Sequence, residues 1–213
     1  MKKKIFIAVM LVCAMLLSAC SLIKSGSADG DQEPAAELQI GTYNASTYQN
    51  AMLGCGATLE GWNYADYTTL AKLNNWTAEA GSEEFMQVLA EQRTFIDMSA
   101  SAADQTRTVN VTFNRMDKVY GGTVTEQNVV DQSVQDMPNL LAQAGYSDVQ
   151  IVPSTVPIAN EEHPGVLITG TVSGVAVFQK QAFIQRGDYI VTVTATSFNE
   201  DHTDEILSQF YHI

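Results

Sequence analysis

The densest set of chemically versatile side chains lies near the carboxyl end of the sequence, in the run Asp201-His202-Thr203-Asp204-Glu205. Carboxylate and imidazole groups at this spacing could bind a metal ion. The same run stands where we expect a helix to begin, and acidic residues there cap free amides and stabilise the helix dipole. We therefore interpret the run as a helix start capped by Asp201 or Thr203, and we expect no metal and no cofactor.

No familiar catalytic motif accompanies these residues. The sequence has no G-x-S-x-G elbow, no phosphate-binding loop and no H-E-x-x-H pair. Cys55 would need a base to act as a nucleophile, and its apolar and small neighbours predict burial instead. Arg186-Gly187-Asp188 spells an adhesive tripeptide, but a tight turn between strands calls for the same residues, and we interpret it as a turn. We predict that the chain is not an enzyme and has no catalytic residues.

An aromatic-rich stretch contains Trp62, Tyr64, Tyr67 and Trp76. Such rings can form a sugar-binding platform, and they can also pack a helix against a sheet. Packing is the interpretation that we favour.

The amino terminus predicts export. Lys2, Lys3 and Lys4 precede an apolar run over residues 5–17, which is shorter than the roughly 20 residues of a membrane span and typical of a signal peptide. Leu17-Ser18-Ala19-Cys20 resembles the bacterial lipobox, in which a cysteine thiol receives a diacylglyceryl group and a peptidase cuts just before it. The resemblance implies that residues 1–19 are removed and that a lipid on Cys20 holds the chain to a membrane, facing outward.

The charge of the chain limits its partners. The net charge is −13, and removal of Lys2, Lys3 and Lys4 leaves 8 basic residues against 24 acidic ones, a net charge of −16. Such a surface repels nucleic-acid phosphates and anionic lipid heads. We therefore expect no nucleic-acid partner, and membrane contact only through the lipid on Cys20.

The remaining sequence predicts a tether and one domain. Residues 20–39 are rich in Ser, Gly, Asp and Glu and predict a lipidated, flexible tether. Residues 40–213 predict a single globular domain of the α+β class, an antiparallel meander with helices packed on it. Strands are expected within residues 43–59, 95–100, 109–113, 149–152, 165–185 and 189–198. Helices are expected over residues 64–73, 82–90, 125–144 (kinked or restarted at Pro138) and 201–210.

The order of these landmarks resembles a family of small Gram-positive-type lipoproteins with a PsbP-like α/β/α sandwich. The resemblance rests on Gly61-Trp62, residues 96–100, Val109-Asn110-Val111 and the segment from Arg186 to Ile190. It implies the sandwich fold and a scaffolding or binding role. Gly54-Cys55-Gly56 departs from the unbroken strand of the family, and we interpret it as a bulge.

Two functions remain open from the sequence. The first is a non-enzymatic interaction or scaffolding module anchored outside the membrane. The alternative is an envelope lipoprotein that binds a small molecule or a glycan, which a pocket beside Trp62 or its neighbours would favour.

Lipidation of Cys20 is directly testable. In Cys20→Ala the thiol that accepts the lipid is absent, so labelled fatty acid should not be incorporated and the uncleaved precursor should accumulate. Metabolic labelling and immunoblotting measure both effects, with Cys55→Ala as the matched control. Normal labelling of Cys20→Ala would contradict the prediction.

Overall fold

The computed structural model describes residues 38–213, so the predictions for residues 1–37, including lipidation of Cys20, lie outside the described residues. The described chain is an antiparallel α+β fold, as predicted. The strands are β1 (Thr42–Asn44), β2 (Thr47–Asn50), β3 (Cys55–Thr58), β4 (Trp62–Tyr64), β5 (Thr94–Ala102), β6 (Arg107–Arg115), β7 (Tyr146–Ile158), β8 (Glu161–Val172), β9 (Val175–Arg186), β10 (Tyr189–Phe198) and β11 (Phe210–His212). The helices are α2 (Tyr67–Asn74), α3 (Glu83–Glu91), α4 (Met116–Val119), α5 (Glu126–Gln143) and α6 (Thr203–Leu207).

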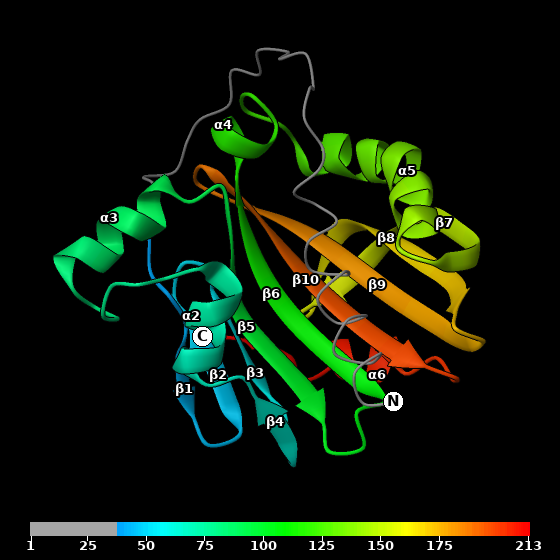
Figure 1. The fold of residues 1–213 in the computed structure, drawn as a ribbon, viewed down its shortest axis with the longest axis horizontal. Coiled ribbons are helices and arrows are strands. Elements are labelled where there is room, and N and C mark those ends of the chain that lie inside the picture. The colour runs from blue at the N-terminus through cyan, green and yellow to red at the C-terminus, as the bar shows by residue number, and fades with distance from the viewer. Residues whose placement is uncertain (1–37) are drawn as a thin grey trace.

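The larger sheet has seven described strands in the order β4-β5-β6-β10-β9-β8-β7 (Figure 1). Its last four strands are consecutive hairpins. Ser173 and Gly174, both at positive φ, turn β8 into β9, as the sequence predicts. Gly187 and Asp188 turn β9 into β10, which confirms the turn interpretation of the Arg186-Gly187-Asp188 tripeptide.

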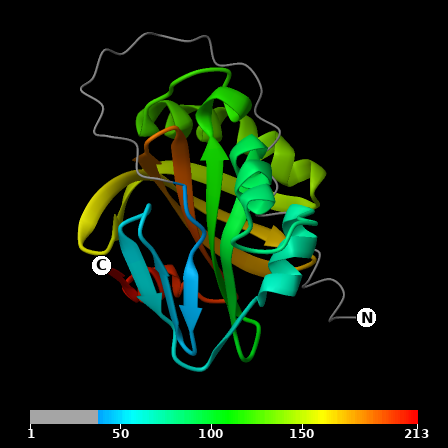
Figure 2. The same ribbon diagram turned by 90° about the vertical axis from the view of Figure 1, so that its left-hand side faces the viewer.

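A second, four-stranded sheet of the order β1-β2-β3-β11 covers one face of the larger sheet, and α5 covers part of the other (Figure 2). The sequence did not predict this second sheet as a separate layer. The helix expected over residues 201–210 is too long: α6 ends at Leu207, and the chain continues as β11. Phe210 pairs with Ala57 on β3 and is buried, so the apolar residue that suggested a helix is a strand residue of the second sheet.

The two central strands, β6 and β10, alternate strictly between their faces. Val109, Val111 and Phe113 of β6 belong to the core that the larger sheet shares with the second sheet. Between these positions, polar side chains pair across the middle of the two strands as Thr112 with Thr192, Asn110 with Thr194 and Thr108 with Thr196, whereas Ile190 and Phe198 nearer the ends of β10 are apolar. The larger sheet therefore has an apolar face toward the second sheet and a polar centre on its other face.

Helix α5 closes a second core over β7, β8 and β9. Thr125 begins the helix with a capping box, because its hydroxyl accepts from the Asn128 amide while the Asn128 side chain accepts from Thr125. Met137 and Leu141 pack with Val166 and other residues of this core. The sequence predicts a kink or a restart at Pro138, and the helix continues through this residue as one element, which excludes the restart.

The outer edge of the larger sheet is protected against further strand pairing. Ala159 and Asn160, both at positive φ, form a two-residue turn that closes on the pair Ile158 and Glu161. Along an antiparallel pair, residues alternate between those that hydrogen-bond to the neighbouring strand and those whose backbone groups point outward. Counted from the hydrogen-bonded pair of Ile158 and Glu161, Pro153 and Pro157 are outward-pointing residues. Because proline has no N–H, two donors are missing along this edge.

Two local expectations are corrected by the structure. Tyr64 belongs to β4 and not to a helix, and α2 begins three residues later, after Asp66 accepts a hydrogen bond from the amide of Thr69. Gly54, at φ 75°, ends the turn between β2 and β3, so the predicted bulge is a hairpin turn.

Gly165 of β8 provides a test of the strand packing. A Cβ there would meet the carbonyl oxygen of Gln181 on β9 and lie 2.8 Å from Cγ2 of Val156. Gly165→Ala should lower the free energy of unfolding by about 1–3 kcal/mol in urea denaturation. Gly170→Ala on the same strand is the control, because its Cβ would lie 3.2 Å from the nearest atom, the carbonyl oxygen of Ser147. Equal stability of the two variants would contradict the packing.

Candidate functional site

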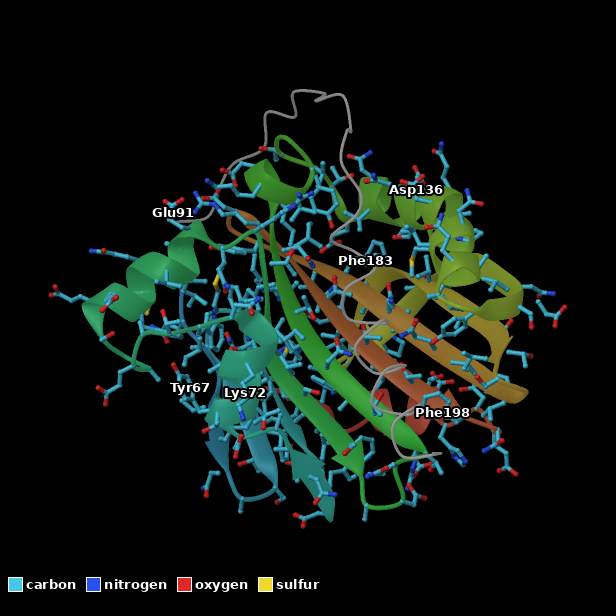
Figure 3. The ribbon with its side chains drawn as sticks, viewed as in Figure 1. Tyr67, Lys72, Glu91, Asp136, Phe183 and Phe198 are labelled. Atoms are coloured by element: carbon cyan, nitrogen blue, oxygen red, sulfur yellow. The ribbon has the colours of Figure 1, made fainter. Side chains whose placement is uncertain are left out.

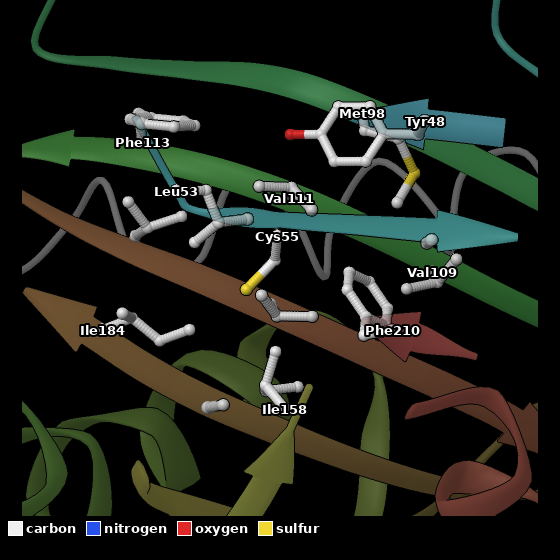
Figure 4. Packing of buried hydrophobic residues seen from close by; sticks show 14 of the residues in the cluster. Tyr48, Leu53, Cys55, Met98, Val109, Val111, Phe113, Ile158, Ile184 and Phe210 are labelled. Carbon is white, nitrogen blue, oxygen red and sulfur yellow. The ribbon is translucent and has the colours of Figure 1, made fainter. Parts of the chain in front are cut away.

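The thiol of Cys55 lies inside the core between the two sheets. Its side chain is 2% exposed and is surrounded by Leu53, Val111 and Ile158 (Figure 4). Burial raises the pKa of the thiol, and the charge of Arg186 offsets this only in part. A thiol that is buried and protonated is a poor nucleophile. The prediction of burial is therefore confirmed.

The run from Asp201 to Glu205 forms a helix start. The N-cap of α6 is His202, whose side chain makes no capping hydrogen bond, so the predicted cap at Asp201 or Thr203 is wrong. Asp201 lies one residue earlier, and its Oδ1 accepts from the amide of Thr203 at 3.0 Å and from its hydroxyl at 2.6 Å. Asp204 pairs with Lys180, and Nδ1 of His202 lies 3.1 Å from Glu205. Within residues 38–213, no group of three or more His, Cys, Asp or Glu side chains is arranged to hold a metal ion.

Among residues 38–213, the one buried carboxyl group is that of Asp97, on β5. Its Oδ2 accepts from the hydroxyl of Tyr48 at 2.5 Å and from Nδ2 of Asn50 at 2.8 Å, while Oδ1 accepts from the amide of Gly41 at 2.7 Å. The hydroxyl of Tyr43 donates to the carbonyl oxygen of the same aspartate. The carboxylate thus joins β5 of the larger sheet to β2 and to the segment that enters β1.

Perturbed carboxyl groups often mark catalytic sites, but the surroundings of Asp97 indicate a structural role. Burial raises its pKa, although the hydrogen bonds from Tyr48, Gly41 and Asn50 oppose this effect. Burial and the nearby carboxylate also raise the pKa of Tyr48 far above its ordinary value. Asp97 is 2% exposed and Tyr48 is fully buried, and every oxygen of the carboxylate is occupied. A substrate could reach none of these groups, so we assign the network to the joining of the sheets.

An accessible site lies instead on the outer face of α2. A depression of about 650 Å³ is bordered by that face and by the loop over residues 75–79. Tyr67, Thr68 and Lys72 border it from the helix, and Glu79 borders it from the loop. All four residues are exposed, and Figure 3 labels Tyr67 and Lys72 on α2.

An aromatic platform forms the base of this depression. Tyr67 is 37% exposed, and its ring lies nearly parallel to that of Trp76, with centroids 6.2 Å apart and an interplanar angle of 23°. Phe85 of α3 meets Trp76 edge-on at 5.1 Å. The hydroxyl of Tyr67 donates to the carbonyl of Ala78 at 2.8 Å. One tyrosine ring is therefore held in a fixed orientation with part of its surface open to solvent.

Hydrogen bonds connect the platform to the larger sheet. Nε1 of Trp76 donates to Oε1 of Gln92 at 2.6 Å, and Nε2 of Gln92 donates to the carbonyl of Asn74 at 2.7 Å. The side-chain amide of Asn74 in turn bonds both the N–H and the carbonyl of Ile96 on β5. Asn75, at φ 58°, ends α2 and turns the chain so that Trp76 enters the core. The platform is thus positioned before any ligand arrives.

The structure separates the aromatic stretch into different roles. Trp76 is buried, whereas Trp62 and Tyr64 are half-buried on β4. Burial raises the pKa of Tyr64 to about 12, and its hydroxyl donates to the carbonyl of Ser46. Of the four aromatic residues in this stretch, all except Tyr67 therefore serve mainly in packing. Sequence reasoning did not single out Lys72 or Glu79. Their spacing from Tyr67 by five and twelve residues gave no motif, although position 72 shares a helix face with position 68.

Comparisons with known proteins add little to this geometry. No family model and no curated protein matches the chain. Among solved structures the chain is similar to LpqN, described as involved in cell envelope biogenesis of Mycobacterium tuberculosis, with a TM-score of 0.34 and 12% identity over 56% of this chain and 78% of that chain. A likeness at that TM-score carries no argument, and the PsbP-like resemblance stays a prediction. None of the helices in residues 38–213 is long and apolar enough to cross a membrane.

Asp97→Asn tests the buried network. Either orientation of the amide sets an N–H group against one of the three donors, so the free energy of unfolding should fall by about 1–3 kcal/mol. The pH dependence is a second readout. The pKa of Asp97 is raised in the folded protein, so the folded state binds the proton more readily than the unfolded state.

The stability advantage of the native protein over Asp97→Asn should therefore shrink as the pH rises from about 4, the ordinary carboxyl range, through the raised pKa. Urea denaturation of both proteins across this range measures the difference, and the other carboxylates cancel. An advantage that grows with pH would contradict the assignment.

Proposed function

We propose that the protein is an outward-facing, lipid-anchored binding protein that captures a saccharide in the depression on α2 and catalyses no reaction on it. The exposed ring of Tyr67, held in place at the base of a depression of about 650 Å³, is the observation that carries this proposal. The depression is open rather than enclosed, so a ligand would be bound there on one of its faces.

The chemistry of the depression suits a sugar. The C–H face of a sugar ring packs on an aromatic ring, and its hydroxyl groups need donors and acceptors around that ring. Thr68, Asn75 and Thr77 supply neutral polar groups, and Lys72 and Glu79 supply charged ones. Such a mixture of an apolar base and a few polar groups orients a ligand as well as binding it.

Of the two functions that the sequence leaves open, the depression favours ligand binding over a scaffolding role. A scaffolding module requires no concave site, whereas capture of a glycan or small molecule does. The lipid expected on Cys20 supports the same proposal, because it would hold the depression near the saccharides of the envelope.

Replacing Tyr67 tests the proposal. Tyr67→Ala removes the stacking surface and should abolish saccharide binding, while Tyr67→Phe keeps the ring and should retain most of it. Isothermal titration against neutral, amino and acidic trisaccharides measures the affinity, with fluorescence of Trp76 as a second signal. Because Tyr67 also contacts Trp76 and Phe85 and donates to the carbonyl of Ala78, circular dichroism and urea denaturation check that both variants keep the fold. Unchanged binding in Tyr67→Ala, or no binding of any saccharide by the native protein, would overturn the proposal.

A further inference from the structure

The charged side chains around the depression do not cancel. Asp66, the N-cap of α2, accepts from the amide of Thr69 at 2.8 Å. That hydrogen bonding, together with the positive charge of Lys72, lowers the pKa of Asp66. Lys72 lies near enough to Asp66 to act on its charge, but neither side chain forms an ion pair within residues 38–213. The side chain of Glu79 has no ion-pair partner in the described part of the chain. The three charged side chains at and beside the depression, Asp66, Lys72 and Glu79, therefore sum to a net charge of −1.

The charge of the whole chain acts in the same direction. The net charge is −13, and it becomes −16 if residues 1–19 are removed. Several of the described cations, Arg107, Arg115, Lys118 and Lys180, already pair with carboxylates. The field outside the protein therefore attracts cationic ligands and repels anionic ones. The exposed face of Tyr67 adds a further preference, because an aromatic ring attracts a cation placed over it.

We infer that the ligand of the α2 depression is an amino saccharide, whose protonated amine lies between the Glu79 carboxylate and the Tyr67 ring while a sugar ring packs on the platform. This inference rests on the proposed function and names its substrate class. Acidic saccharides are disfavoured by Glu79 and by the net charge, even though Lys72 borders the same depression.

A matched pair of ligands tests the inference. The β-1,4-linked trimer of glucosamine and its fully N-acetylated form share one backbone and differ in the positive charge at each sugar. Titrations at low ionic strength and mildly acidic pH, where the amines are protonated, should show the glucosamine trimer binding about fivefold more tightly. The preference should decline at high salt, because exposed charge pairs are screened.

Two variants identify the residue responsible. Glu79→Gln should remove the preference, so that the two trimers bind with equal affinity. Glu162→Gln, which removes an exposed carboxylate on β8, should keep the preference. Circular dichroism checks that both variants fold.

Each outcome separates the inference from the function it rests on. Equal affinity for the two trimers, with binding still dependent on Tyr67, would overturn the inference and leave saccharide capture standing. A preference for the glucosamine trimer that survives Glu79→Gln would also overturn it. If no saccharide shows binding that depends on Tyr67, both the inference and the proposed function are overturned.

Discussion

The irregularity in β5 between Ile96 and Met98 is the constraint on which the rest of the structure depends. The extra residue at this bulge, Asp97, directs its carboxylate to the second sheet, where Gly41, Tyr48 and Asn50 donate to it. Just before it, the backbone of Ile96 is free to bond the side chain of Asn74 on α2. One bulge thus attaches the second sheet on one side and the helix that carries the depression on the other.

A buried carboxylate is an expensive way to join two layers. Desolvation opposes the charged form, and three donors are needed to offset that cost. What the arrangement provides is a defined position, because a carboxylate with three donors from separate segments fits only one register. The aromatic platform depends on a similar but neutral set of bonds through Gln92 and Asn74. The base of the depression is therefore joined to the central sheet by hydrogen bonds in addition to apolar packing.

The sequence predicts the local elements of this fold better than their assembly. Alternation in β6, the turns at Ser173-Gly174 and Gly187-Asp188, and the Ser82 cap of α3 are all visible in short windows of sequence. The bulge is not, because simple alternation would place Asp97 and Met98 on opposite faces of β5. The second sheet is also hidden, since β3 and β11 are joined from opposite ends of the chain. At the candidate site, the aromatic residues were visible as a group. Only tertiary packing distinguishes the exposed Tyr67 from the buried Trp76.

The central claim is that the depression on α2 is where this protein binds its ligand, and chemical-shift mapping tests it most directly. Two-dimensional amide spectra of the ¹⁵N-labelled domain, residues 38–213, would be titrated with the glucosamine trimer. The account predicts that the largest shifts fall on residues 67–79 and on the side-chain N–H of Trp76, with little change on β7 or β8. Saturable shifts centred elsewhere, such as the polar centre of β6 and β10, would contradict it.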